Sequence, residues 1–89
     1  MQTTIHIVAA GNTLAPALSE LITLGFSLSR LPAPAQGEPI FRAVKGGVIL
    51  EAPDTVALLG LAVLAERRGA KWEPNDAEVA ALINLEGNS

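Results

Sequence analysis

The residues best suited to binding are three cations beside an aromatic side chain. Arg67, Arg68 and Lys71 lie close together in the chain, and Trp72, the sole tryptophan, follows directly. Cations near a helix C-terminus interact favourably with the helix dipole, which would be a structural role. Trp and Arg are also enriched among the residues that dominate binding at protein interfaces. The cluster is therefore either structural, as a helix end with Trp72 covering the core, or an interface anchor, and a nucleic-acid contact is a further alternative.

The turn Gly11-Asn12-Thr13 is the candidate ligand-binding segment. It lies between a predicted strand and a predicted helix, where helix N-termini attract anions. The longer glycine-rich loop of nucleotide-binding motifs is missing here. The turn predicts either a helix cap alone or a site for a small ligand.

Acid–base candidates are few, and each has a structural interpretation. His6 falls within a predicted strand, and no partner for it can be identified from spacing. Asp54 suits a helix cap, and Glu51 can pair with Arg42 or Lys45 across a hairpin. The chain has no Cys and one His. We therefore expect no catalytic residue, metal site or cofactor, and an enzyme is a distant third choice.

Composition limits the partners. The net charge is −3, with Lys and Arg numbering 6 against 9 Asp and Glu. Nucleic acids and anionic membranes would repel a chain with this negative net charge, so we expect neither as a partner. Hydrophobic residues form 49% of the chain, and the mean hydropathy is +0.38. Apolar surface is then expected to remain exposed, which favours a protein partner and, slightly, a homodimer.

The start of the chain has neither the basic nor the apolar region of a signal peptide. Its longest apolar run, residues 56–65, is too short for a membrane span, which needs about 20 residues. We expect a bacterial, cytoplasmic protein.

The first half of the chain predicts a strand, a helix and a second strand. Residues 4–9 would alternate between two faces, with Ile5, Ile7 and Ala9 on one face, and they are rich in β-branched side chains, as strands are. A helix capped at Asn12 or Thr13 then carries an apolar stripe and ends at Gly25. Residues 26–30 alternate again. Short turns between these elements predict a right-handed βαβ crossover with two parallel strands.

The second half predicts a hairpin and two helices. A proline-rich loop at residues 32–39, expected to be mobile, precedes strands at 40–44 and 48–52 joined by a Gly-Gly turn. A helix follows to about Arg68, apolar nearly all round and so expected to be buried on more than one side. Mid-helix Gly60 suggests close approach of another backbone. A third helix runs to about residue 85, with a frayed tail at 86–89.

That third helix is expected to begin at Asn75 or Asp76 and to turn Val79, Leu82 and Ile83 inward. Together these elements predict one small, two-layer α+β domain over residues 1–89, in the order β-α-β-β-β-α-α. Its sheet is expected to be mixed, with helices packed on one face.

The first thirty residues resemble the opening of ACT-type and other ferredoxin-like regulatory domains, with the Gly11-Asn12 turn and Leu24-Gly25-Phe26 at corresponding places. The resemblance implies dimerisation and amino-acid binding near the first turn. The proline-rich loop and the third helix depart from that pattern. Two hypotheses therefore stand: a non-enzymatic protein-interaction or regulatory module, and a small-molecule sensing domain.

Overall fold

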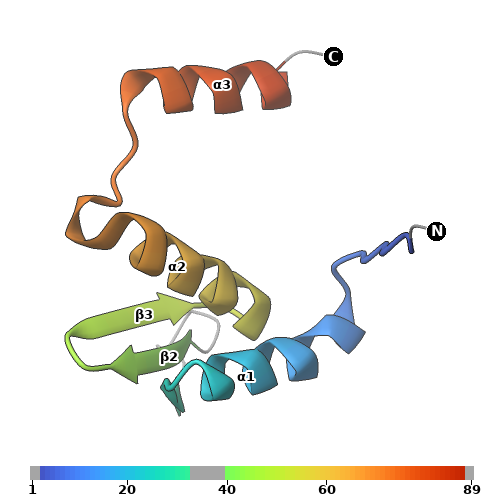
Figure 1. Ribbon diagram of the computed structural model, residues 1–89, viewed down its shortest axis with the longest axis vertical. Coiled ribbons are helices and arrows are strands. Elements are labelled where there is room, and N and C mark those ends of the chain that lie inside the picture. Colours follow the sequence, from blue (N-terminus) through green and yellow to red (C-terminus); the bar gives the residue numbers. More distant parts are fainter. Residues whose placement is uncertain (1–2, 33–39, 88–89) are drawn as a thin grey trace.

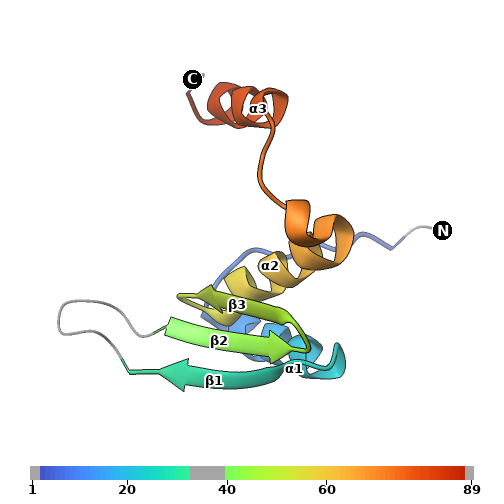
Figure 2. The same ribbon diagram turned by 90° about the vertical axis from the view of Figure 1, so that its left-hand side faces the viewer.

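The computed structural model describes residues 3–32 and 40–87. In these residues the chain is a small α+β domain with a three-stranded antiparallel sheet and three α-helices (Figures 1 and 2). The elements are η1 (Gly11–Thr13), α1 (Leu14–Thr23), β1 (Ser27–Leu31), β2 (Ile40–Lys45), β3 (Val48–Ala52), α2 (Thr55–Arg68), η2 (Gly69–Lys71) and α3 (Asp76–Gly87).

The sheet is built on the predicted hairpin. The strand order is β1-β2-β3, and β2 pairs antiparallel with both neighbours. Gly46 in the connecting turn has a φ of 55°, which glycine adopts without the steric cost that other residues meet. Arg42 and Glu51 are opposite each other in this register, and Arg42 Nε donates to Glu51 Oε2 at 2.8 Å. The expected cross-strand ion pair is confirmed.

The core lies between one face of the sheet and helices α1 and α2. Strand alternation turns Ala43, Leu50 and Ala52 toward the helices, where all three are buried. Leu21 of α1 and Leu58 of α2 are fully buried against them. The other sheet face, which carries the Arg42–Glu51 pair, is partly exposed to solvent.

Local signals in the sequence set the ends of α1 and α2. Gly25 follows α1 with a φ of 99°, the left-handed conformation that commonly ends helices. The Asp54 carboxylate accepts a hydrogen bond from Ala57 N at 2.7 Å and caps α2. Thr55 Oγ1 donates to Leu14 O at 2.7 Å, which ties the starts of the two helices together.

The predicted first strand is wrong. Residues 4–9 form no strand, and their apolar side chains are exposed by 80% at Ile5, 74% at Ile7 and 67% at Val8. The predicted order, mixed sheet and parallel βαβ crossover are therefore not found in the described residues. A strand of this type is stable only beside another strand, and no neighbour is present here.

Two predictions about the later helices are also wrong. Val79, Leu82 and Ile83 of α3 do not face a core, because their exposed fractions lie between 42% and 60%. Helix α2, by contrast, packs against both the sheet and α1, as expected, through Thr55, Leu58 and Ala62. Among the described residues no other backbone approaches Gly60, since a Cβ placed there would meet nothing within 4 Å.

Most of the proline-rich loop, residues 33–39, and the last two residues of the predicted tail lie outside the described residues. Glu86 and Gly87 belong to α3.

Candidate interaction surface

An apolar hollow opens at the edge of the sheet, between β3 and the outer side of α2. Its volume is about 310 Å³. The lining residues come from β3, from α2 and from the segment after η2: Ile49, Leu50, Glu51, Leu61, Leu64, Ala65 and Trp72. Six of these seven side chains are apolar or aromatic, so the hollow suits an apolar group better than a charged one. We call it the β3–α2 hollow.

The floor and the rim of this hollow differ in exposure. Leu50 is buried in the core, whereas Ile49 is 62% exposed and Trp72 is 55% exposed. Leu64 on α2 is 38% exposed. Large apolar side chains left this open commonly mark a place where another molecule binds.

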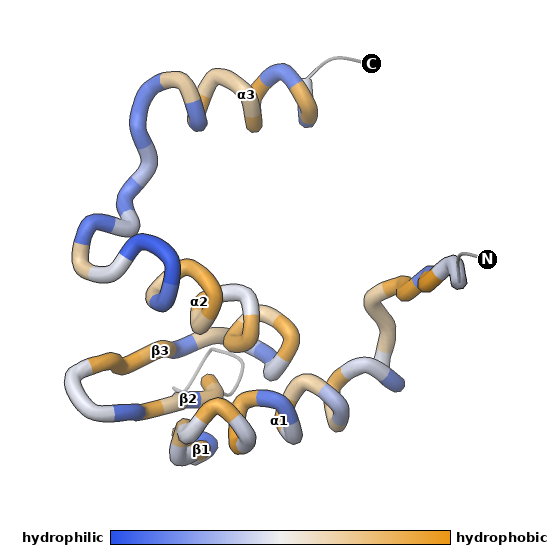
Figure 3. The backbone as a smooth tube through the Cα atoms, viewed as in Figure 1, coloured by the Kyte–Doolittle hydropathy of each residue, from blue (hydrophilic) through white to orange (hydrophobic). Residues whose placement is uncertain are grey.

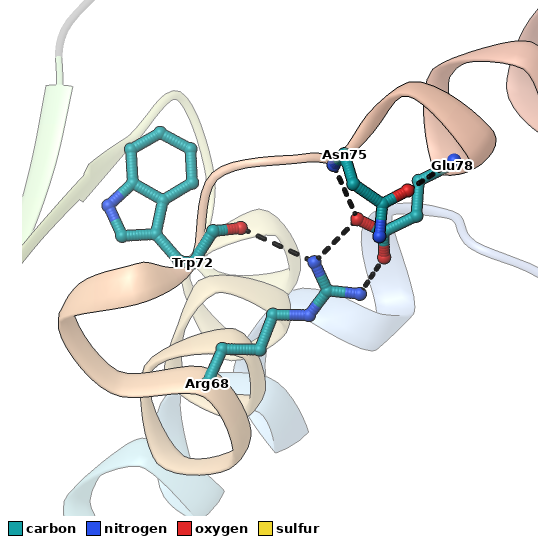
Figure 4. Close-up of polar contacts among 4 residues, drawn as sticks. All are labelled: Arg68, Trp72, Asn75 and Glu78. Atoms are coloured by element: carbon teal, nitrogen blue, oxygen red, sulfur yellow. Dashed lines mark hydrogen bonds and ion pairs between the residues drawn. The ribbon is translucent and has the colours of Figure 1, made fainter.

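Trp72 is positioned by a polar network on the side away from its ring (Figure 4). Arg68 Nη1 donates to the Trp72 carbonyl oxygen at 3.4 Å and to Glu78 Oε1 at 3.0 Å. A second bond from Arg68 Nη2 to Glu78 Oε2 makes the contact bidentate. The network therefore links the end of α2 to the beginning of α3.

Two capping bonds complete the network. Glu78 N donates to Asn75 Oδ1 at 2.8 Å, and Asn75 N donates to Glu78 Oε1 at 2.9 Å. This reciprocal pair is a capping box, which confirms the predicted start of α3 at Asn75 or Asp76. The Glu78 carboxylate thus serves both Arg68 and the helix end.

These contacts shift two pKa values. The hydrogen bond from Arg68, followed by the bond from the Asn75 backbone, lowers the pKa of Glu78 from 4.5 to about 2. The hydrogen bond and the charge of Glu78 raise the pKa of Arg68. The side chains of Arg68 and Glu78 are both more than a third exposed, at 39% and 34%. Solvent therefore screens the pair, and it positions the chain more than it stabilises the fold.

The structure separates the four residues predicted as one interface cluster. Trp72 lines the β3–α2 hollow, while Arg68 is engaged with Glu78. Arg67 lies in the last turn of α2 and Lys71 ends η2, and both are exposed. Only Trp72 of the four contributes to the hollow.

Sequence reasoning missed the aliphatic part of this surface, Ile49, Leu61 and Leu64. The signal was present in α2, whose apolar residues cover more of its circumference than one packed face can use. Such a helix was expected to pack on more than one side. In the structure α2 packs on the sheet and on α1, and the outer side that carries Leu64 is left exposed.

The predicted ligand turn lies elsewhere. Gly11 and Thr13 line a wide, shallow hollow of about 440 Å³ that also reaches Asp54 and Ala57 at the start of α2. Thr13 Oγ1 is already bonded to Ala10 O at 2.7 Å, and Asp54 is used as a cap. Asn12 is exposed and does not line this hollow. The polar groups best placed to hold a ligand are thus engaged within the chain.

The other candidate acid–base residues do not form a site. His6 is exposed in the segment of residues 4–9, and Glu51 forms an ion pair with Arg42. Asp54 caps α2.

Comparison of the chain with protein-family models, curated proteins and solved structures finds no match. Within residues 3–32 and 40–87, every helix is too short or too polar to cross a membrane.

Proposed function

We propose that the chain is a small non-enzymatic interaction or regulatory module that binds a protein chain in the β3–α2 hollow. The observation that carries the proposal is the apolar lining at a free sheet edge, with Trp72 on its rim. The proposal includes the cytoplasmic location expected from the sequence.

The size and chemistry of the hollow support a protein segment as the ligand. A volume of about 310 Å³ lies at the lower end of the range for binding pockets and holds a few apolar side chains. Glu51 is the charged residue of the lining, and its carboxylate is paired with Arg42. A Trp beside Leu and Ile side chains is the composition of an interface anchor.

The amino-acid-sensing alternative has less support. Its candidate residues lie at the wide hollow near Gly11, where the Thr13 hydroxyl and the Asp54 carboxylate have partners within the chain. A thermal-shift screen with free amino acids checks it. A ligand at a hundredfold excess over its Kd would add about 2.7 kcal/mol to the free energy of unfolding. We expect no such stabilisation.

The test compares two adjacent residues of α2. Leu64 lines the hollow, whereas Val63 does not and is similarly exposed, at 47% against 38%. Tagged chains carrying Leu64→Asp or Val63→Asp are recovered from the native host and weighed by native mass spectrometry. We expect a stoichiometric second chain, of the same or another protein, to be lost from Leu64→Asp and retained by Val63→Asp.

The two variants add the same charge to one helix, so a general effect of that charge would appear in both. Equal binding by both variants and the wild type would contradict the proposed surface. Circular dichroism of each variant shows whether it is still folded.

A further inference from the structure

The N-terminal segment, residues 3–9, has the pattern of a strand, but no strand in the described part of the chain lies beside it. Its sequence is rich in β-branched residues and carries no Asp, Glu, Lys or Arg. Ile5, Ile7 and Val8 are exposed by 80%, 74% and 67%. In Figures 1 and 3 this segment projects away from the sheet with apolar residues along it. We call it the N-terminal arm.

Two hydrogen bonds set the local path of the chain where the arm joins α1. Thr13 Oγ1 donates to Ala10 O at 2.7 Å, and Ala10 N donates to Thr13 Oγ1 at 3.4 Å. Ala10 itself is fully extended. In this arrangement the arm is not part of the sheet of its own chain, which consists of β1, β2 and β3 in the described residues.

The same chain offers an edge that lacks a strand. In the described residues β3 pairs with β2 alone, so its outer edge is free. The β3–α2 hollow lies along that edge, and its lining would receive the side chains on one face of an added strand. The opposite edge, β1, is less suitable because it carries Arg30 and two serines, Ser27 and Ser29.

The exposed area is large for one chain. The molecule exposes 7233 Å², whereas a compact monomer of 9.2 kDa exposes about 4900 Å². The excess is well above the roughly 800 Å² that each partner buries in a standard protein interface. The radius of gyration is 15.5 Å, against about 12 Å for a compact domain of this length. The arm and α3, which contain no buried residue in the described chain, contribute to this excess, and its size would allow each chain to bury the area of a standard interface.

We propose that the partner in the β3–α2 hollow is a second copy of this chain, whose N-terminal arm adds as a fourth strand to the free edge of β3. The exchange is reciprocal, so each chain gives an arm and receives one, as an isologous dimer requires. Backbone hydrogen bonds to β3 supply affinity, and apolar side chains of the arm fill the hollow. This inference rests on the proposed function, because it names the occupant of the same hollow.

The first test removes the strand-forming ability of the arm. Neighbouring residues of a strand point their N–H groups to opposite sides, so Ile7→Pro with Val8→Pro removes one donor from the ladder in either register. The matched control, Ile7→Val with Val8→Ile, exchanges the two side chains and keeps the composition. We expect the wild type and the control to be dimers by native mass spectrometry at micromolar concentration, and the proline variant to be monomeric.

The arm lies outside the core, so the proline variant should keep its helix and sheet content by circular dichroism. A wild type that is monomeric, or a folded proline variant that remains dimeric, would overturn the inference.

The second test separates exchange between chains from pairing within one chain. A dimer assembled from equal amounts of ¹³C-labelled and unlabelled chains is studied by isotope-filtered NMR. We expect contacts between residues 3–9 and 48–52 to join labelled with unlabelled chains. Contacts found only within one chain would show that the arm pairs with its own sheet.

The two proposals fail in distinguishable ways. In one outcome the wild-type chain does not dimerise but binds a different protein, and this binding is lost in Leu64→Asp and kept in Val63→Asp. That outcome would refute the exchange of arms and still support the interaction function. A dimer that is unaffected by Leu64→Asp would refute both the hollow as an interaction surface and the placement of the arm in it.

Discussion

The packed body of the molecule and its two projecting ends differ in how their apolar residues are buried. The body consists of α1, the three strands and α2, and it holds all the buried residues that form the core cluster. The N-terminal arm and α3 contain no buried residue within the described chain. Figures 1 and 2 show both ends standing away from the sheet. Apolar sequence alone therefore does not bury a segment, because burial also requires a surface to pack against.

The largest expected effect contrasts a leucine of the body with a leucine of α3. Leu58 is fully buried, whereas Leu82 is 53% exposed. Leu58→Ala removes core contacts and should lower the free energy of unfolding by about 2–5 kcal/mol. Leu82→Ala makes the same chemical change on a helix surface and should alter it by less than about 0.5 kcal/mol. Urea denaturation at low protein concentration measures both.

An equal loss of unfolding free energy in the two leucine variants would contradict this expectation. It would mean that α3 packs as firmly as the body.

A smaller effect contrasts the two helix caps. Asp54 caps α2 and Asn75 caps α3, each through a side-chain oxygen that accepts a backbone N–H. Asp54→Ala should cost about 1 kcal/mol of global stability, because α2 unfolds with the body. Asn75→Ala should speed amide hydrogen exchange in the first turn of α3 and leave exchange of the core amides unchanged. Slowed or unchanged exchange in α3 would argue against the assigned cap.

The smallest effect concerns the link between body and α3. The pKa of Glu78 is lowered to about 2 in the fold, from 4.5. A lowered carboxyl pKa means that the contribution of the Arg68–Glu78 contact is complete above pH 4.5 and is lost as the pH falls toward about 2. The protection factor of the amides at the start of α3, which is the intrinsic exchange rate at each pH divided by the observed rate, should therefore fall over this range in the wild type.

Glu78→Gln removes the titrating group and serves as the control for that experiment. Its exchange at the start of α3 should be faster at neutral pH and should lack this acid transition. The same pH dependence of the protection factor in both proteins would contradict the role of the Glu78 carboxylate.

The sequence predicted those parts of the fold that depend on local chemistry. The Gly46-Gly47 turn, the Asp54 cap and the Gly25 helix end each act through neighbouring residues, and all are found as expected. The strand at residues 4–9 and the inward face of α3 depend on what lies beside them, and alternation or helical spacing does not contain that information. Both predictions were wrong for this reason.

The candidate site follows the same division. Trp72 was identified from its residue type, but the hollow it borders needs β3 and α2 to be placed side by side. The excess of apolar residues on α2 indicated that a second side needed covering, and it did not indicate which element would do so. Ile49, Leu61 and Leu64 could therefore not be selected from the sequence.

The central claim, that a second copy covers the β3–α2 hollow, is tested most directly by Trp72 itself. It is the chain's sole tryptophan and is 55% exposed in a single chain, so its fluorescence reports the state of the hollow without a label. The emission is measured with the mean mass of the same samples, for the wild type and for the Ile7→Pro, Val8→Pro variant. We predict that the wild-type dimer emits at shorter wavelength than the variant. As dilution halves the mean mass, the wild-type emission should shift to longer wavelength and reach the wavelength of the variant. An emission that stays constant while the mass halves would contradict the claim.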